Sequence, residues 1–127
     1  MQKILIIEDD PVAGAVYKRF LQANGYAIEL AIDGAEGLER LAAFAPDAVV
    51  LDLMMPKISG MDVLQTLRAQ EAFRELPVIV MTNAYVPAFV DQAIQAGASH
   101  VFDKSNDTPA AILGMLQSLL ESAAQKL

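Results

Sequence analysis

The chain has 127 residues, of which 54% are hydrophobic, and its formal net charge is -7. This length is sufficient for one domain with a sizeable buried core. The negative charge argues against direct binding to nucleic acid or to an anionic membrane surface, because both require clustered Lys and Arg. The sequence contains no Cys, which excludes disulfides and thiolate metal sites and fits a reducing compartment. We therefore expect partners that are proteins.

Targeting and linker signals are missing from the sequence. No stretch reaches the roughly twenty successive apolar residues of a membrane helix. The start, MQKILII, is too short for the apolar core of a signal peptide, and acidic residues follow it directly. No composition break, Gly/Ser linker, low-complexity tract or internal repeat divides the chain. We expect a cytoplasmic protein with one domain over residues 1–127, no membrane contact and no output domain in this chain.

Short apolar runs rich in Val and Ile alternate with longer segments of helical periodicity, which is the pattern of repeated βαβ units. Asp10 is the expected N-cap of the first helix, Pro11 its first residue and Gly25 its stop. In chain order, the pattern predicts a strand at 3–7, a helix from 11, a strand at 27–31, a helix at 35–44, a strand at 48–51, a helix at 60–70, a strand at 77–81, a helix at 86–96, a strand at 100–103 and a helix at 109–125.

These five βα units predict an α/β fold, an open and doubly wound parallel sheet of five strands with five helices. The first, third and fourth apolar runs are almost continuous, which is typical of central strands covered by helices on both faces. In such sheets, ligands bind beyond the carboxyl ends of the strands. The residues at those ends are therefore the candidate functional residues.

Polar residues follow four of the predicted strands. The first strand is followed by EDD at residues 8–10, and the third ends in Asp52. The fourth strand ends in Thr82 and Asn83, and the fifth ends in Lys104. Because parallel strands end at the same edge of a sheet, we expect acids, a hydroxyl and an ammonium group to meet there.

The chemistry of these groups indicates a metal site. Carboxylates a few ångströms apart repel one another, and one of them takes up a proton unless a cation lies between them. Oxygen ligands without His or Cys favour a hard ion, and few carboxylates leave room for water and phosphate oxygens, so Mg²⁺ with phosphate is predicted. Asp52 can then accept a phosphoryl group as a nucleophile, Lys104 can pair with its oxygens, and the Thr82 hydroxyl can donate a hydrogen bond.

Four ordered motifs make the chain resemble a receiver domain of the two-component response-regulator family, similar to the chemotaxis regulators. They are ILIIEDDP at 4–11, LDLMMPKISG at 51–60, VIVMTNA at 78–84 and AGASHVFDK at 96–104. The resemblance covers essentially the whole chain and implies a flavodoxin-like sheet with strand order 2-1-3-4-5. It also implies a phosphorylation-dependent signalling receiver of a two-component or phosphorelay system, with self-catalysed phosphoryl transfer and autodephosphorylation, and not a turnover enzyme.

The resemblance assigns a role to each matching residue. Asp52 is the phosphoacceptor, Thr82 is the switch hydroxyl and Lys104 pairs with the phosphate. The implied Mg²⁺ ligands are Asp9 and Asp52 directly, the main-chain carbonyl of Met54, and Glu8 through a water. The implied phosphodonor is a phosphohistidine on a histidine kinase or phosphotransfer domain, and no further cofactor is implied.

Three positions depart from the family pattern. Asn83 stands where a small residue usually follows the switch hydroxyl. Its larger side chain is expected either to narrow access to the acyl phosphate or to form a hydrogen bond with it. Val101 stands where Tyr or Phe usually reports phosphorylation, and its neighbour Phe102 points to the opposite side of the strand. Ser105 replaces a proline that usually follows a cis bond, and a cis bond before a non-proline costs about 2.5–4 kcal/mol, so a trans bond is expected there.

The same residues allow other interpretations, of which the sequence disfavours the phosphatase and the flavodoxin. Taken singly, EDD is an exposed acidic turn, Asp52 ends a strand, Lys104 lies on the surface and Thr82 caps the next helix. A phosphatase of the haloacid dehalogenase type needs a second Asp two residues after its nucleophile, where this chain has Met54. A flavodoxin needs hydroxyls and N–H groups in its first loop, where this chain has carboxylates. A degenerate receiver that binds partners without being phosphorylated is the main alternative, because Asn83 and Val101 are atypical.

The last predicted helix has an unusually wide apolar arc. One stripe contains Ile112, Leu116, Leu119 and Ala123, and a second contains Leu113, Leu120, Ala124 and Leu127. Either this helix is deeply packed, or the face formed by the fourth helix, the fifth strand and the fifth helix binds a downstream protein target or forms a homodimer. His100 is interpreted as a packing residue, and Met54, Met55, Met61 and Met81 as core residues.

Overall fold

The computed structural model describes residues 1–125, which form one five-stranded parallel sheet in the order β2-β1-β3-β4-β5. The strands are β1 (Lys3–Ile7), β2 (Ala27–Ala31), β3 (Ala48–Asp52), β4 (Val78–Thr82) and β5 (His100–Asp103). The helices are α1 (Pro11–Ala23), α2 (Gly34–Phe44), α3 (Gly60–Arg68), α4 (Pro87–Gln95) and α5 (Pro109–Gln125), with a short 3₁₀ helix, η1 (Glu71–Phe73). The predicted fold class and strand order are confirmed.

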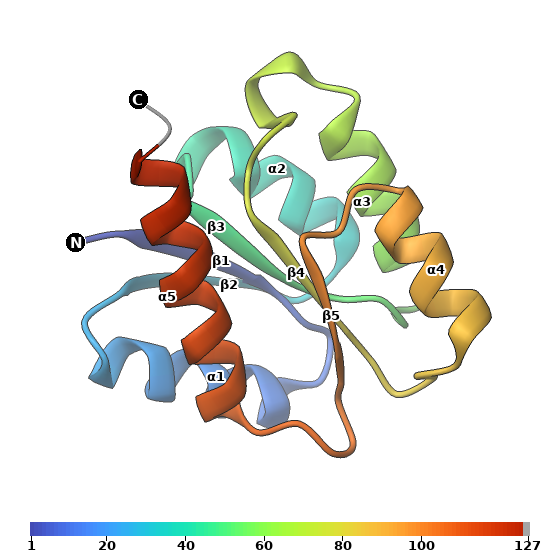
Figure 1. Ribbon diagram of the computed structural model, residues 1–127, viewed down its shortest axis with the longest axis horizontal. Helices are drawn as coiled ribbons and strands as arrows, with labels where there is room; N and C mark the ends of the chain where they lie inside the picture. The colour runs from blue at the N-terminus through green and yellow to red at the C-terminus, as the bar shows by residue number, and fades with distance from the viewer. Residues whose placement is uncertain (126–127) are drawn as a thin grey trace.

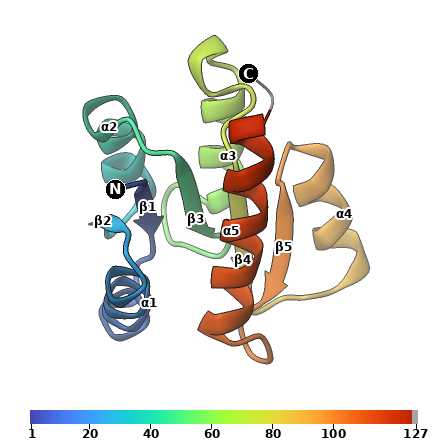
Figure 2. The same ribbon diagram turned by 60° about the vertical axis from the view of Figure 1, so that its left-hand side comes forward.

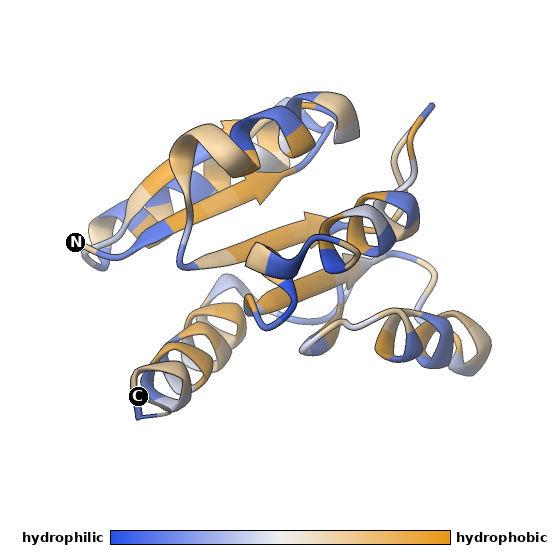
Figure 3. Ribbon diagram, turned by 90° about the horizontal axis from the view of Figure 1, so that it is seen from above, coloured by the Kyte–Doolittle hydropathy of each residue, from blue (hydrophilic) through white to orange (hydrophobic). Residues whose placement is uncertain are grey.

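Helices cover both faces of the sheet (Figures 1 and 2). The side chains of α2, α3 and α4 pack with one set of strand residues, represented by Leu5, Leu51 and Val80. Those of α1 and α5 pack with the alternate set, represented by Ile6 and Val50. Seen from above, the strands are hydrophobic over most of their length (Figure 3). This is expected for the central strands β1, β3 and β4, whose residues are almost all buried between the two helix layers.

The helix and strand ends differ from the predicted ones by a residue or two. Asp10 caps α1 by accepting hydrogen bonds from the N–H groups of Val12 and Ala13. β3 and β4 each include the polar residue that follows the apolar run, because Asp52 pairs with Met81 and Thr82 pairs with Asp103 in the ladder. The sheet pairing therefore holds the backbone of both functional candidates.

One predicted core residue lies on the surface. Met54 is 53% exposed, whereas Met55 and Met81 are buried and Met61 is half-buried. The prediction for Met54 is wrong because, in the loop after β3, its neighbours Leu53 and Met55 pack into the core and the Met54 side chain is left facing solvent.

The apolar arc of α5 divides into packed and exposed positions. Ile112, Leu116 and Leu120 are buried against the sheet, and Leu113 and Leu119 are half-buried. Ala123 and Ala124 are exposed, and Leu127 lies outside the described residues. Deep packing therefore accounts for the centre of the arc. Within residues 1–125, no helix combines the length and the apolar character needed to cross a membrane.

Candidate functional site

The carboxyl ends of β1 and β3 bring three acids together. These strands are neighbours, with Ile7 paired to Leu51, so Glu8 and Asp52 follow at the same level of the sheet. Glu8, Asp9 and Asp52 each offer a carboxylate oxygen, and these oxygens lie within 4.8 Å of one another. The predicted meeting of the acids is therefore observed.

Two of these acids are buried, and the ammonium group of one lysine lies close to both. Glu8 is 1% exposed and Asp52 is 3% exposed. The Lys104 ammonium forms an ion pair with Glu8 Oε1 and lies 3.3 Å from Asp52 Oδ2. Because buried charges are costly without partners, the Lys104 ion pairs lower the cost of burying Glu8 and Asp52.

The surroundings of Asp52 disfavour its ionised form. Burial, followed by the interaction with the Glu8 carboxylate, raises the pKa of Asp52 to about 7, although Lys104 and the Met54 N–H act in the opposite direction. The pKa of Lys104 is raised as well, because its ion pairs with Glu8 and Asp52 outweigh the effect of its own burial. One lysine is therefore insufficient to neutralise the site, and additional positive charge favours the carboxylate form of Asp52.

The donor set fits a hard divalent cation. Its atoms are carboxylate oxygens from Glu8, Asp9 and Asp52. Asp9 is partly exposed, so the cluster is open to water on one side. The Met54 N–H donates to Asp52 Oδ1 at 3.1 Å, which holds the main chain of residue 54 close to the carboxylate. Few carboxylates with access to water are typical of Mg²⁺ sites.

Thr82, the last residue of β4, lies next to Lys104, which directly follows β5. The Lys104 N–H donates to the Thr82 carbonyl at 2.9 Å. The Thr82 side chain is fully buried, and its hydroxyl accepts a hydrogen bond from the Ala84 N–H at 3.0 Å. Val86 is the N-cap residue of α4, so the interpretation of Thr82 as a helix cap is wrong.

The three departures from the receiver pattern occupy different environments. Asn83 and Ser105 are exposed, and the Ser105 hydroxyl donates to Asn83 Oδ1 at 3.3 Å. The described residues contain no cis peptide bond, so the Lys104–Ser105 bond is trans as expected. Val101 is buried on the α2, α3 and α4 side of the sheet, and Phe102 on the opposite side. The His100 ring packs on Phe102 with a centroid distance of 4.6 Å, which supports its interpretation as a packing residue.

Sequence reasoning missed two residues that shape the site. A Cβ on Gly60 would lie 2.2 Å from the Asp52 carbonyl oxygen, so only glycine allows α3 to begin against the end of β3. Tyr17 on α1 is buried, which raises the pKa of its phenol, and the charges of Lys104, Glu8 and Asp52 act on it. A glycine eight residues after Asp52, at the start of a predicted helix, could have indicated a close contact between that helix and the end of β3. No local pattern places Tyr17 near the acids.

Known proteins with similar sequences are response regulators. Residues 4–117 match the model of the response regulator receiver domain. The response regulator MprA of Mycobacterium ulcerans (strain Agy99) is 44% identical over 80 residues, which is 63% of this chain and 34% of that protein. MprA of Mycobacterium avium (strain 104) is 42% identical over the same length. This chain therefore spans about a third of the length of the curated relatives that it matches.

Solved structures agree with the family match. The chemotaxis protein CheY4 of Vibrio cholerae has a TM-score of 0.88 at 26% identity, covering 94% of this chain and 98% of that chain. The BeF3-activated receiver domain of Klebsiella pneumoniae RstA has a TM-score of 0.85 at 28% identity, with the same coverage of 94% and 98%. A CheY-like protein of Methanospirillum hungatei JF-1, at 21% identity, shares the fold with a TM-score of 0.92 over 100% of this chain and 99% of that chain. The chain belongs to the response regulator receiver domain family, a signalling family of two-component systems.

Proposed function

We propose that this chain is a phosphorylation-dependent receiver that accepts a phosphoryl group onto Asp52 from a phosphohistidine of a histidine kinase or phosphotransfer domain. The observation that carries the proposal is the buried Asp52 carboxylate, which lies beside two further acids and 3.3 Å from the Lys104 ammonium. A strand end that only terminated the sheet would not bring these charged groups together in a buried position, because desolvation makes them costly.

In the proposed transfer, an Asp52 oxygen attacks phosphorus while the bond from phosphorus to the imidazole nitrogen breaks, and the electron pair stays on that nitrogen. Asp9, Asp52, the Met54 carbonyl and, through a water, Glu8 would hold Mg²⁺. Bound Mg²⁺ offsets negative charge on the phosphoryl oxygens. Lys104, which pairs with Glu8 and Asp52 in the unphosphorylated chain, also pairs with the incoming phosphoryl group.

The response to phosphorylation begins at Thr82. Its hydroxyl accepts the Ala84 N–H in the described state, so its hydrogen is available for donation to a phosphoryl oxygen. When the hydroxyl moves toward that oxygen, the loop from Asn83 to Val86 follows, because it is covalently attached. Phosphorylation thus shifts an equilibrium between two loop arrangements, and self-catalysed hydrolysis reverses it.

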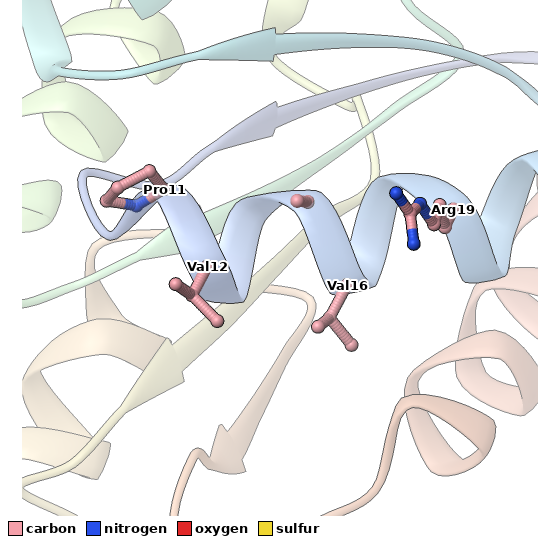
Figure 4. A pocket seen from close by; sticks show the side chains of 5 residues that line it. Pro11, Val12, Val16 and Arg19 are labelled. Carbon is pink, nitrogen blue, oxygen red and sulfur yellow. The ribbon is translucent and has the colours of Figure 1, made fainter.

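The face of α1 next to the acids is the proposed docking site for the phosphodonor domain. Val12 and Val16 are 72% and 49% exposed and project from the same side of α1 (Figure 4). With Pro11, Ala15 and Arg19 they line a shallow surface pocket. A donor histidine has to reach Asp52, so the donor domain covers the surface where α1 begins, one residue after the Asp10 cap.

The face formed by α4, β5 and α5 is the proposed output surface, for a downstream protein or a second copy of the chain. Tyr85 and Val86, in the loop from Asn83 to Val86, and Phe89 on α4 are all more than 40% exposed there. Leu113 is half-buried and available at the edge of this face, whereas Leu120 is buried in the core. We expect Leu113→Glu to weaken self-association or target binding. Sedimentation and partner binding that stay unchanged would remove Leu113 from this surface.

Intact-protein mass after incubation with Mg²⁺ and phosphoramidate tests the phosphoacceptor. We expect one added phosphoryl group in the wild type, none in Asp52→Asn and none with a chelator. Asp91→Asn, which removes an exposed acid on α4, is the matched control and should be phosphorylated like the wild type. A wild type that binds Mg²⁺ but gains no mass, either from phosphoramidate or from a phosphohistidine domain, would favour a degenerate receiver that acts through protein contacts alone.

A further inference from the structure

The outer edge of the site contains a contact that the proposed transfer does not use. Asn83 directly follows Thr82, and Ser105 directly follows Lys104. Their side chains meet, with the Ser105 hydroxyl donating to Asn83 Oδ1 at 3.3 Å. Both residues are exposed, whereas Thr82 is fully buried and the Lys104 side chain is 13% exposed. The pair therefore lies on the solvent side of two functional candidates and is one bond away from each in the chain.

The backbone on the Ser105 side is held in place by a local network. Asp103 Oδ1 accepts the Ser105 N–H at 3.0 Å, and Asp103 Oδ2 accepts the Asn106 side-chain amide at 2.7 Å. Asp107 Oδ2 in turn accepts the Asp103 N–H at 2.7 Å. These hydrogen bonds fix the loop between β5 and α5, and they therefore fix the position of the Ser105 hydroxyl.

The backbone on the Asn83 side belongs to the loop that has to move. Asn83 lies between Thr82 and Ala84, which are joined by the hydrogen bond from the Ala84 N–H to the Thr82 hydroxyl. A change in the position of Thr82 therefore shifts Asn83 as well. The last backbone bond between the two strand ends runs from the Lys104 N–H to the Thr82 carbonyl, and the Asn83–Ser105 contact extends this connection into the loops.

We propose that the Asn83–Ser105 hydrogen bond is a latch that holds the loop after Thr82 in its unphosphorylated arrangement. This inference rests on the proposed function. The latch opens when Thr82 moves toward a phosphoryl group on Asp52, so it opposes the phosphorylated arrangement, and Asn83 and Ser105 act as positioning residues for Thr82. It requires an amide at 83 and a hydroxyl at 105, so the two departures from the receiver pattern form one device. A single hydrogen bond of this kind shifts an equilibrium about two- to tenfold.

The first test measures the affinity for beryllofluoride, which mimics a phosphoryl group, at saturating Mg²⁺. We expect Asn83→Ala and Ser105→Ala each to bind it about two- to tenfold more tightly than the wild type. The double variant should gain no more than either single variant, because both remove the same bond. Ser105→Thr keeps the hydroxyl and should behave as the wild type. Unchanged affinities, additive gains, or a Ser105→Thr variant that behaves as Ser105→Ala would each overturn the latch.

A second test needs no phosphoryl mimic. In the unphosphorylated protein, we expect hydrogen exchange of the Ala84 amide to be about two- to tenfold faster in both alanine variants and unchanged in Ser105→Thr. Exchange at the wild-type rate in the alanine variants would overturn the latch. If the wild type binds no beryllofluoride, the proposed function fails at Asp52, and the exchange of Ala84 by itself then decides whether the latch exists.

Discussion

The ends of β1 and β3 and the ends of β4 and β5 form two halves of one site, and they are built differently. The acidic half consists of Glu8, Asp9 and Asp52, which lie close together and are mostly buried. The loop half consists of Thr82, Asn83 and Ser105, in which a buried hydroxyl is followed by exposed residues joined by side-chain hydrogen bonds. Lys104 directly follows β5, but its ammonium group reaches into the acidic half.

This difference indicates that the acidic half is rigid and that the loop half can change conformation. In the acidic half, any displacement leaves a buried charge without its partner, which costs several kcal/mol, so its geometry is held firmly. In the loop half, single hydrogen bonds at the surface cost only about 1 kcal/mol each to exchange for water. Under the proposed function, a phosphoryl group on Asp52 would therefore change the loop half without displacing the acidic half.

The largest expected effect comes from removing the residue that joins the two halves. Lys104→Met should lower the rate of phosphorylation by phosphoramidate about 10²–10³-fold, because the developing charge on the phosphoryl oxygens loses its ammonium partner. The measurement is the initial rate of mass gain at saturating Mg²⁺. Lys57→Met, which removes an exposed lysine from the loop after β3, is the control. A rate within threefold of the wild type would mean that Lys104 serves only the fold.

A larger side chain in the core beneath the loop half tests whether the sheet is tightly packed there. Val101 is buried against the α2, α3 and α4 side, so Val101→Phe should lower the free energy of unfolding by about 1–3 kcal/mol. Urea unfolding followed by circular dichroism measures it, with Val86→Phe at an exposed position as the control. An unchanged free energy of unfolding would show that free space exists next to Val101. The core beneath the loop half would then be loosely packed as well.

The charge balance of the acidic half predicts a pH dependence in metal-free protein. Because the pKa of Asp52 is raised to about 7 from its ordinary value of 3.8, the folded state holds a proton that the unfolded chain has lost. The stability that this proton provides is present at low pH and is lost as the pH rises through 7. Between pH 6 and pH 8, the free energy of unfolding should fall by about 1.4 kcal/mol more in the wild type than in Asp52→Asn.

Urea unfolding in the presence of a chelator measures this pH dependence. Added Mg²⁺ should reduce it, because a divalent cation stabilises the ionised carboxylate. Parallel pH profiles for the wild type and Asp52→Asn would show that Asp52 is ionised throughout this range and that Lys104 alone neutralises the acidic half.

The smallest expected effect is the best measure of how independent the halves are. Asn83→Ala and Ser105→Ala should keep Mg²⁺ affinities within about twofold of the wild type, because neither side chain carries charge or belongs to the acid cluster. Asp9→Asn should lose at least about tenfold in the same titration. A tenfold loss in either alanine variant would mean that the loop half supports the metal site directly.

The sequence by itself determined the order of the elements and the candidates at the strand ends. Strand periodicity, the Asp10 cap and the Pro11 start are local properties, so the strands and α1 begin and end where expected, within a residue or two. The topology of parallel strands then required Glu8, Asp9 and Asp52 to share one edge. Motif resemblance supplied their proposed roles.

Only the tertiary structure decided which groups touch. The ion pairs of Lys104, the collision that excludes a Cβ at Gly60 and the contact between Asn83 and Ser105 join residues that are distant in the chain. The exposure of Met54 has the same origin, since an apolar residue is buried only where another element covers it. Local propensity acts over a few residues, whereas burial and charge pairing depend on how the elements pack. It is this packing that brings the residues of the site together.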